Sequence, residues 1–285
     1  MEKNIYELRY FAEQIRVETL KEFQELGFGH VGGSMSIIET LAVLYGGIMN
    51  INPQNPKWQD RDYLVVSKGH SGPAVYATLA LKGYMPMEQL KTLNKPGTDL
   101  PSHCDRNHTI GVDMTTGSLG QGMSTALGLA LGNRLDKRNN YTYLIVGDGE
   151  CDEGQIWEGA LSAAHFKADN LIMFVDANKQ QLDGYTDDIL SLGDISAKLV
   201  SFGWHTQSID GHDVEAIWNA VEAAKEAKGQ PSAIILNTIK GHGCTIAEGI
   251  LSNHHMAFTK EKMQEAIDCA QKVLDAAAKA WEVST

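Results

Sequence analysis

Two stretches of sequence decide the fold: residues 141–150 read YTYLIVGDGE, and residues 171–180 read LIMFVDANKQ. Each begins as a continuous apolar run, which is typical of a strand buried on both faces of a sheet. Each then ends in polar residues. A helical pattern over residues 153–167 lies between them. Because a strand, a crossover helix and a second strand return the chain to the same edge of a parallel sheet, we expect the two polar ends to lie side by side.

The alternation of strands and helices extends in both directions. Two more apolar runs, at residues 63–66 and 233–236, are predicted strands. Further helical patterns lie at residues 120–136 and 213–228, and a closing C-terminal helix is expected at residues 259–282. This alternation predicts an α/β fold, a three-layer parallel sheet with helices on both faces. Because no repeat, low-complexity tract or domain boundary interrupts the pattern, we expect residues 1–285 to form a single domain.

Composition excludes several classes of protein. The formal net charge is −12, from 24 basic and 36 acidic side chains, and basic clusters such as Lys137-Arg138 are too short to neutralise a nucleic-acid backbone. The longest apolar stretch, at residues 41–51, is too short and too interrupted by glycine to span a bilayer. We therefore expect neither nucleic acid nor a membrane as a partner.

The four cysteines and the first residues bear on the compartment. Cys104, Cys151, Cys244 and Cys269 show no metal-ligand spacing and are too few to form a disulfide scaffold for 285 residues. Residues 1–4 lead directly into an amphipathic helix and lack the apolar core of a signal peptide. We expect reduced thiols and a cytoplasmic protein.

The polar residues after the two deciding strands suit a metal ion. Asp148 offers a carboxylate, Asn178 an amide oxygen and Gln180 a backbone carbonyl, and Mg²⁺ prefers oxygen ligands together with diphosphate oxygens. Gly147 and Gly149 would let the backbone approach the phosphates. Ligands of open α/β sheets bind at the carboxyl ends of the strands, so the sequence predicts a metal and diphosphate site there.

Several of the ten histidines occur in glycine-flanked loops. These are His30, His70, His103 and the pair His254-His255. None has the spacing of a zinc ligand. A single histidine of this kind is usually structural, but four such loops favour hydrogen-bonding and proton-transfer groups around a polyhydroxylated substrate.

Other polar residues have simpler interpretations. His212 precedes Asp213, which we predict to be a helix N-cap. Glu153 and Glu158 would lie on the helix that follows the Gly-Asp-Gly turn, and composition alone indicates a solvated helix face.

Taken together, the motifs resemble those of transketolase. They occur in that family's order and spacing: GHVGGSMS at 29–36, SKGHSGPAVY at 67–76, LPSHCDRNHTIGVDMTTGSLGQG at 100–122, VGDGECDEGQIWEG at 146–159, FVDANKQQLDG at 174–184 and TIKGHG at 238–243. The resemblance covers nearly the whole chain and is specific as a set.

The resemblance implies a cofactor, thiamine diphosphate, and a role for each matched residue. The metal, Mg²⁺ or Ca²⁺, would be held by Asp148, Asn178 and the carbonyl of Gln180. The expected contacts of the cofactor are Gly117 and Leu119 at its centre, His70, Gly149, Glu150, Asn178 and His254 at its diphosphate end, and Glu153.

The resemblance also assigns catalytic and interface residues. His30, His103 and His254 would line the sugar channel, with His103 near the reacting carbon and His30 toward the acceptor. Glu153 and Glu158 would join a carboxylate network that links cofactor sites across a subunit interface. The family has His followed by Gly near position 254, where this chain has two histidines, so His255 stays an alternative to His254.

A complete transketolase is much longer and adds a pyrimidine-binding domain and a C-terminal domain. The resemblance therefore implies the N-terminal subunit of a split, two-chain enzyme, with two copies of each chain in the assembly. Its reaction would be the transfer of a two-carbon ketol unit from a ketose phosphate to an aldose phosphate, with the pentose phosphates as default substrates.

Three alternatives stay open at the level of sequence. The α subunit of a thiamine-diphosphate-dependent 2-oxo-acid dehydrogenase also carries Gly-Asp-Gly and an Asn, but it lacks the His30 and His103 loops. A 1-deoxyxylulose-phosphate synthase is normally a fused chain with a different histidine loop. A non-catalytic subunit that binds the cofactor for assembly is the third alternative.

Overall fold

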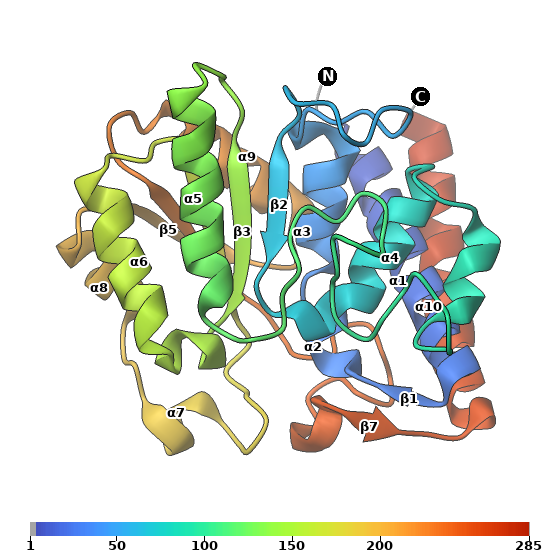
Figure 1. Ribbon diagram of the computed structural model, residues 1–285. Helices are drawn as coiled ribbons and strands as arrows, with labels where there is room; N and C mark the ends of the chain where they lie inside the picture. The colour runs from blue at the N-terminus through green and yellow to red at the C-terminus, as the bar shows by residue number, and fades with distance from the viewer. Residues whose placement is uncertain (1–3, 285) are drawn as a thin grey trace.

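The computed structural model describes residues 4–284, so residues 1–3 and 285 of the expected domain lie outside the described residues. Its centre is a five-stranded parallel sheet of order β2-β3-β4-β6-β5 (Figure 1). The strands are β2 (Tyr63–Val66), β3 (Thr142–Gly147), β4 (Leu171–Ala177), β5 (His205–Asp210) and β6 (Ser232–Asn237). Their carboxyl ends all point to the same edge, which positions the site described below.

Each face of the sheet carries its own hydrophobic core. Along β3, Tyr143 and Ile145 contribute to one core, and Leu144 and Val146 contribute to the other. This alternation follows from the two-residue period of a strand. The sheet is buried on both sides, as its uninterrupted apolar runs predict.

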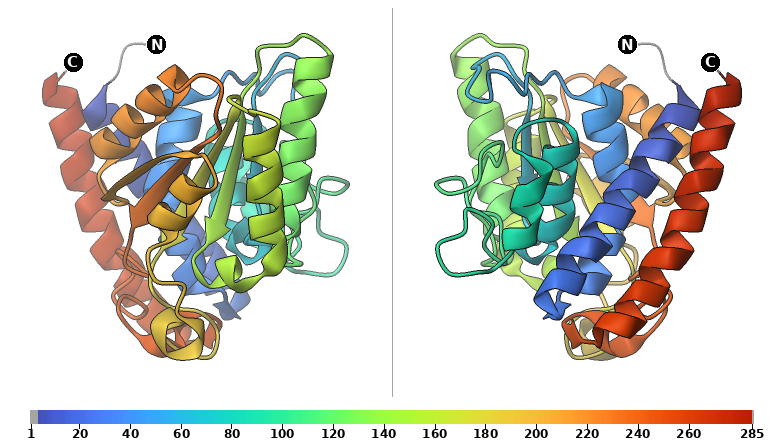
Figure 2. Two further views of the ribbon diagram at one scale, coloured as in Figure 1. Left: turned by 90° about the vertical axis from the view of Figure 1, so that its left-hand side faces the viewer. Right: turned by 90° about the vertical axis from the view of Figure 1, so that its right-hand side faces the viewer.

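Two groups of helices cover the two faces. One face carries α5 (Gln121–Leu135), α6 (Gly154–His165) and α8 (Ile195–Ser201). The other carries α1 (Ile5–Leu26), α2 (Val31–Met35), α3 (Ile38–Val43), α4 (Gly72–Leu81) and α9 (Val214–Glu226). The last helix, α10 (Lys260–Ser284), lies along α1 at the outside of the molecule (Figure 2). The predicted three-layer α/β fold is confirmed.

Short elements surround the carboxyl edge of the sheet. Strands β1 (Phe28–Gly29) and β7 (Met256–Ala257) pair as a small antiparallel ribbon below it, and α7 (Thr186–Leu190) lies at the same end (Figure 1). The remaining turns of helix are η1 (Leu44–Ile48), η2 (Gly69–Ser71), η3 (Met87–Thr92), η4 (Gly149–Asp152) and η5 (Leu251–Asn253).

Part of the β structure is absent from the sequence predictions. Strand β5 is not among the predicted strands, because His205–Asp210 contains mostly polar residues and is only partly buried at the edge of the sheet. The β1–β7 ribbon is also absent from the prediction, since two-residue strands leave no periodic signal. The predicted N-cap Asp213 is confirmed, because its side chain accepts a hydrogen bond from the N–H of Glu215 at the start of α9.

One stretch of the described chain, Val31–Ile48, is long and apolar enough to cross a membrane, with a mean hydropathy of 1.4. The fold divides it among α2, α3 and η1, and 89% of it is buried inside the molecule. It is longer than the apolar stretch expected from the sequence, and it forms part of the hydrophobic core.

Candidate functional site

A pocket of about 150 Å³ opens at the carboxyl ends of β3 and β4. Nine of the residues singled out in the sequence line it: His70, Leu119, Gly147, Asp148, Gly149, Glu150, Asn178, Gln180 and His254. Gly33, Lys68, Gln181, Leu182 and Lys240 complete its walls. The fold thus brings together residues that lie far apart in the sequence, such as His70 and His254.

Asp148 and Asn178 lie where neighbouring strands end. Asp148 accepts hydrogen bonds from the N–H groups of Gly149 (2.9 Å) and Lys179 (2.6 Å), which fix its carboxylate. The Asn178 side chain donates through Nδ2 to Asp176 (2.8 Å) and accepts through Oδ1 from the N–H of Gln180 (3.1 Å). Both side chains are therefore held in place, and each keeps oxygen lone pairs for a further ligand.

The pocket offers hard oxygen donors to a divalent cation. Asp148, Asn178 and Gln180 supply a carboxylate, an amide oxygen and a carbonyl oxygen, which is the set that Mg²⁺ and Ca²⁺ prefer. The Oε1 atom of Gln180 is also buried and has no hydrogen-bond partner among residues 4–284. Burial and the charge of Asp176 raise the pKa of Asp148 to about 7. A cation at this carboxylate would displace a proton that is partly bound near neutral pH.

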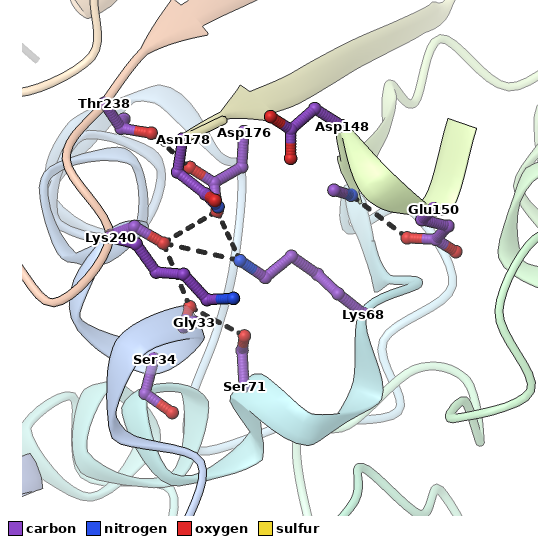
Figure 3. A network of polar contacts seen from close by, with 12 residues as sticks. Gly33, Ser34, Lys68, Ser71, Asp148, Glu150, Asp176, Asn178, Thr238 and Lys240 are labelled. Atoms are coloured by element: carbon purple, nitrogen blue, oxygen red, sulfur yellow. Dashed lines mark hydrogen bonds and ion pairs between the residues drawn. The ribbon is translucent and has the colours of Figure 1, made fainter. Parts of the chain in front are cut away.

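Lys68 and Asp176 form a buried ion pair beneath the pocket (Figure 3). Asp176 also accepts hydrogen bonds from Ser36 (2.7 Å), Asn178 and Thr238. Burial acts to raise the pKa of Asp176, but the charge of Lys68 and these donors outweigh it and lower the pKa. The sequence did not reveal this pair. Lys68 follows the apolar run of β2, and Asp176 lies near the end of the apolar run of β4.

A second buried amine, Lys240, faces the same pocket. Its Nζ atom donates to the carbonyl of Gln180 (3.2 Å) and lies 3.1 Å from Nδ1 of His254. Burial, followed by the charge of Lys68, lowers the pKa of Lys240 to about 8. Because Lys68 is already paired with Asp176, the Lys240 amine is the cation that would meet an anionic ligand such as a diphosphate. Lys240 also occupies the carbonyl that the sequence assigned to the metal.

Glu150 uses its carboxylate inside the protein. It accepts hydrogen bonds from the hydroxyl of Ser67 and from the N–H groups of Gly120 (2.8 Å) and Gly147 (3.1 Å). These contacts join the start of α5 to the end of β3. Glu150 therefore holds two glycine-rich turns together around the pocket, and both of its carboxylate oxygens accept hydrogen bonds from within the protein.

Five histidines gather beside the pocket. The ring of His30 lies 5.3 Å from His70, 5.4 Å from His103, 5.6 Å from His254 and 4.7 Å from His255, measured between centroids. His254 lines the pocket, and His255 does not. Gly117 adopts φ +139, and a Cβ atom there would meet the ring of His103 at 3.0 Å. The cluster thus continues the pocket outward, past Gly117.

Burial favours the neutral form of four of these imidazoles, His30, His70, His103 and His254. It lowers the pKa of His30 to about 4, with further contributions from His255, His103 and Lys240. Burial and Lys240 lower the pKa of His254 to about 3, and burial lowers the pKa of His70 and of His103 as well. A neutral imidazole both donates and accepts hydrogen bonds, which suits the hydroxyl groups of a sugar.

The depressed pKa of His30 predicts a pH dependence of stability. An unfolded histidine has a pKa of about 6.5. Between that pH and the lowered pKa of His30, the unfolded chain binds a proton at this residue and the folded chain does not. The free energy of unfolding should therefore fall as the pH is lowered from about 6.5 toward about 4. We expect His30→Gln to weaken this slope in urea titrations across that range. The control is His165→Gln at an exposed position, which should leave the slope as in wild type. Equal slopes for wild type and His30→Gln would contradict the prediction.

Glu153 and Glu158 lie outside the pocket. Both are exposed at the start of α6, and a Cβ atom on Gly120 would meet Cβ of Glu153 at 2.9 Å. They form part of the outer surface next to the loop that carries Leu119. Neither residue is among those that line the pocket.

A second charged cluster lies away from the pocket. Arg16 pairs with Glu39, and Glu39 also faces Nδ1 of His212 at 3.3 Å. The ring of His242 stacks on that of His212, with centroids 3.8 Å apart. Glu39, His212 and His242 lie close enough to share a metal ion. However, His212 already accepts a hydrogen bond from the N–H of Ile239 (2.8 Å), so the cluster acts as a structural network.

Comparison with known proteins shows which family the chain resembles in sequence. Residues 8–273 match the family model of the transketolase thiamine diphosphate binding domain. The chain is 55% identical to a 6-deoxy-6-sulfo-D-fructose transketolase subunit from Clostridium sp. (strain MSTE9), over 94% of this chain and 97% of that protein. It is 36% identical to an apulose-4-phosphate transketolase subunit from Phocaeicola vulgatus, over 84% and 85% of the two chains.

A solved structure agrees with these relatives. Transketolase from Leishmania mexicana superposes with a TM-score of 0.84 and 29% sequence identity, over 99% of this chain but only 46% of that one. The chain thus spans about half the length of that enzyme. These matches favour a transketolase over a 2-oxo-acid dehydrogenase α subunit. The chain belongs to the transketolase family, in which it corresponds to the thiamine diphosphate binding domain.

Proposed function

We propose that this chain is the cofactor-binding subunit of a two-chain transketolase, which transfers a two-carbon ketol unit from a ketose to an aldose phosphate. The observation that carries the proposal is the pocket at the ends of β3 and β4, where the expected diphosphate and metal residues meet. Its volume of about 150 Å³ is below the roughly 300–1,000 Å³ of a complete small-molecule site. A partner chain would supply the remaining walls.

The metal and the diphosphate would bind side by side. Asp148, Asn178 and the carbonyl of Gln180 would hold Mg²⁺ or Ca²⁺, and Lys240 would turn from that carbonyl toward the phosphates. His70, Gly149 and His254 would contact the diphosphate, with Glu150 fixing the loops around it. A Cβ atom at Gly149 would meet Cβ of Gln181 at 2.7 Å, so only glycine leaves the backbone this accessible.

Gly117 and Leu119 would lie against the centre of the cofactor. Thiamine diphosphate supplies the carbanion chemistry needed to cleave and form a bond next to a ketone. This chain contributes binding, orientation and charge. Glu153 and Glu158, exposed beside the Leu119 loop, would belong to the contact between subunits.

The neutral histidines would position the sugar. His103 would hydrogen-bond the hydroxyl groups of the donor near the reacting carbon, and His30 would face the acceptor. Because both pKa values are lowered, these rings would exchange hydrogen bonds with hydroxyl groups without carrying a charge at neutral pH. His254 would link the sugar channel to the diphosphate through Lys240.

The donor sugar is inferred from the relatives. The protein that shares 55% identity acts, by its name, on 6-deoxy-6-sulfo-D-fructose, and we propose a 6-sulfo ketose as the first donor to test. Pentose phosphates, the general expectation for the family, form the second set. The partner would carry the pyrimidine-binding and C-terminal domains, with two copies of each chain in the assembly.

The thiols suit a cytoplasmic enzyme. Cys104, Cys151 and Cys244 are buried and Cys269 is exposed, and all four are free. Burial raises the pKa of Cys104 to about 12 and of Cys244 to about 11. These two groups stay protonated and unreactive, which fits reduced, structural cysteines.

The test is ketol transfer by the chain alone and by the chain mixed with its co-encoded partner. Each sample receives thiamine diphosphate, Mg²⁺, ribose 5-phosphate, and either 6-deoxy-6-sulfofructose or xylulose 5-phosphate. We expect transfer only in the mixture. Transfer at a normal rate by the chain alone would contradict the two-chain proposal, and an assembled but inactive mixture would favour a non-catalytic subunit.

A further inference from the structure

The β1–β7 ribbon sets two histidines opposite each other. Its register pairs Phe28 with Ala257 and Gly29 with Met256. One step further along both strands, the same register brings His30 opposite His255. Directly opposed residues in an antiparallel pair have neighbouring side chains, and the two rings are indeed 4.7 Å apart at 74°.

His254 and His255 are adjacent in sequence but face different surroundings. His254 lines the pocket, with Nδ1 at 3.1 Å from Lys240 and its ring 4.9 Å from His70. His255 is exposed, and its ring contacts are with His30 and Phe28, the latter at 5.7 Å. The second imidazole therefore lies on the outer side of His30, farther from the pocket than His254.

The surroundings of His255 leave its ring nitrogens available. In the described part of the chain, no ion pair or hydrogen bond engages its ring, whereas Lys240 engages His254. No carboxylate within residues 4–284 lies at ion-pair distance from His30, His103 or His255. The rings thus line a path of hydrogen-bonding groups with no carboxylate paired to them, which leads from His254 in the pocket to the exposed His255.

We propose that His255 is a specificity-determining residue, which hydrogen-bonds a sugar hydroxyl beyond the one that His30 reaches. This inference rests on the proposed ketol transfer. A sugar that extends from the pocket past His103 and His30 next meets His255. A site built to hydrogen-bond a hydroxyl discriminates against substrates that lack it, so His255 would favour longer acceptors over short ones.

The experiment separates hydrogen bonding from ring packing. His255→Phe keeps an aromatic ring against His30 and Phe28 but removes both nitrogens, while His255→Asn keeps hydrogen-bonding groups without the ring. Each variant is assembled with the partner, and KM and kcat are measured with ribose 5-phosphate and with glycolaldehyde, whose short carbon chain ends before His255. His165→Phe is the matched control, because His165 is also exposed and also contacts a phenylalanine ring.

We expect His255→Phe to raise KM for ribose 5-phosphate by about tenfold, the effect of one lost hydrogen bond. Its kcat should change little, its KM for glycolaldehyde should stay as in wild type, and His255→Asn should recover part of the loss. A His255→Phe enzyme with wild-type KM for both acceptors would overturn the inference alone. An assembled wild type that transfers to neither acceptor would overturn the proposed function as well.

Discussion

Replacing Asp148 with asparagine is expected to lower ketol transfer by at least about 10³-fold, because the proposed metal site would lose its one carboxylate ligand, and a bound metal stabilises charge by several kcal/mol. Asparagine has the same shape but no charge, so it would hold the cation far more weakly. The fold should lose little stability, because asparagine can still accept from one of the two N–H groups that Asp148 engages. Burial already raises the pKa of Asp148 to about 7, so the cation-free protein gives up little by losing this charge.

Binding and stability measurements separate these two expectations. Calorimetric titration of the isolated chain with thiamine diphosphate and Mg²⁺ should give heat for wild type and none for Asp148→Asn. The melting temperature without ligand should change little in the variant, because the loss of one N–H acceptor offsets the removal of a buried charge. Asp188→Asn on α7, an exposed carboxylate, is the control that should bind normally. Unchanged cofactor affinity in Asp148→Asn would remove Asp148 from the proposed metal site.

Arg16→Met is expected to destabilise the fold by about 3–5 kcal/mol, the usual effect of removing one partner of a buried ion pair. The side chains of Arg16 and Glu39 are only 2% and 5% exposed. Arg16 also donates to Glu13 (3.1 Å) and to the carbonyl of His242 (2.6 Å). Without Arg16, the buried Glu39 carboxylate keeps His212 as its one hydrogen-bond partner among residues 4–284.

Urea denaturation of three variants tests this second prediction. Arg16→Met should show the full loss. The double variant Arg16→Met/Glu39→Met should recover most of it, because it removes the fully buried carboxylate and leaves only the partly exposed Glu13 without Arg16. Arg138→Met, whose pairs with Asp60 and Asp136 lie at the surface, should change the free energy of unfolding by at most about 1 kcal/mol. A double variant as unstable as the single one would show that packing, and not charge, dominates at this position.

The sequence is most informative where burial leaves a pattern. Residues 141–146 and 171–175 are apolar almost throughout, and they form the two neighbouring strands β3 and β4. Residues 205–210 read HTQSID, and only their place at the edge of the sheet makes them a strand. A partly buried edge can tolerate polar side chains, so neither hydrophobicity nor period identifies β5.

The site divides in a similar way. Asp148 and Asn178 are predicted to meet, because parallel strands order their ends, and the structure places both in one pocket. The partners of Lys68 and Lys240 could not be predicted from the sequence. A lysine is ordinarily exposed, and nothing in the motif SKGH indicates that its amine will pair with a carboxylate 108 residues away. Such pairings depend on tertiary structure, which local patterns do not encode.

The β1–β7 ribbon has a consequence for biosynthesis. It joins Phe28, among the first residues to leave the ribosome, to Ala257, which emerges only after most of the chain has been made. Contacts at such separation form late, since a long loop must close before they stabilise anything. A nascent chain can form all five strands of its sheet and still lack His254 at the pocket and His255 beside it. Because the cofactor stabilises only a chain that binds it, thiamine diphosphate would protect the completed domain and leave truncated chains exposed to proteases.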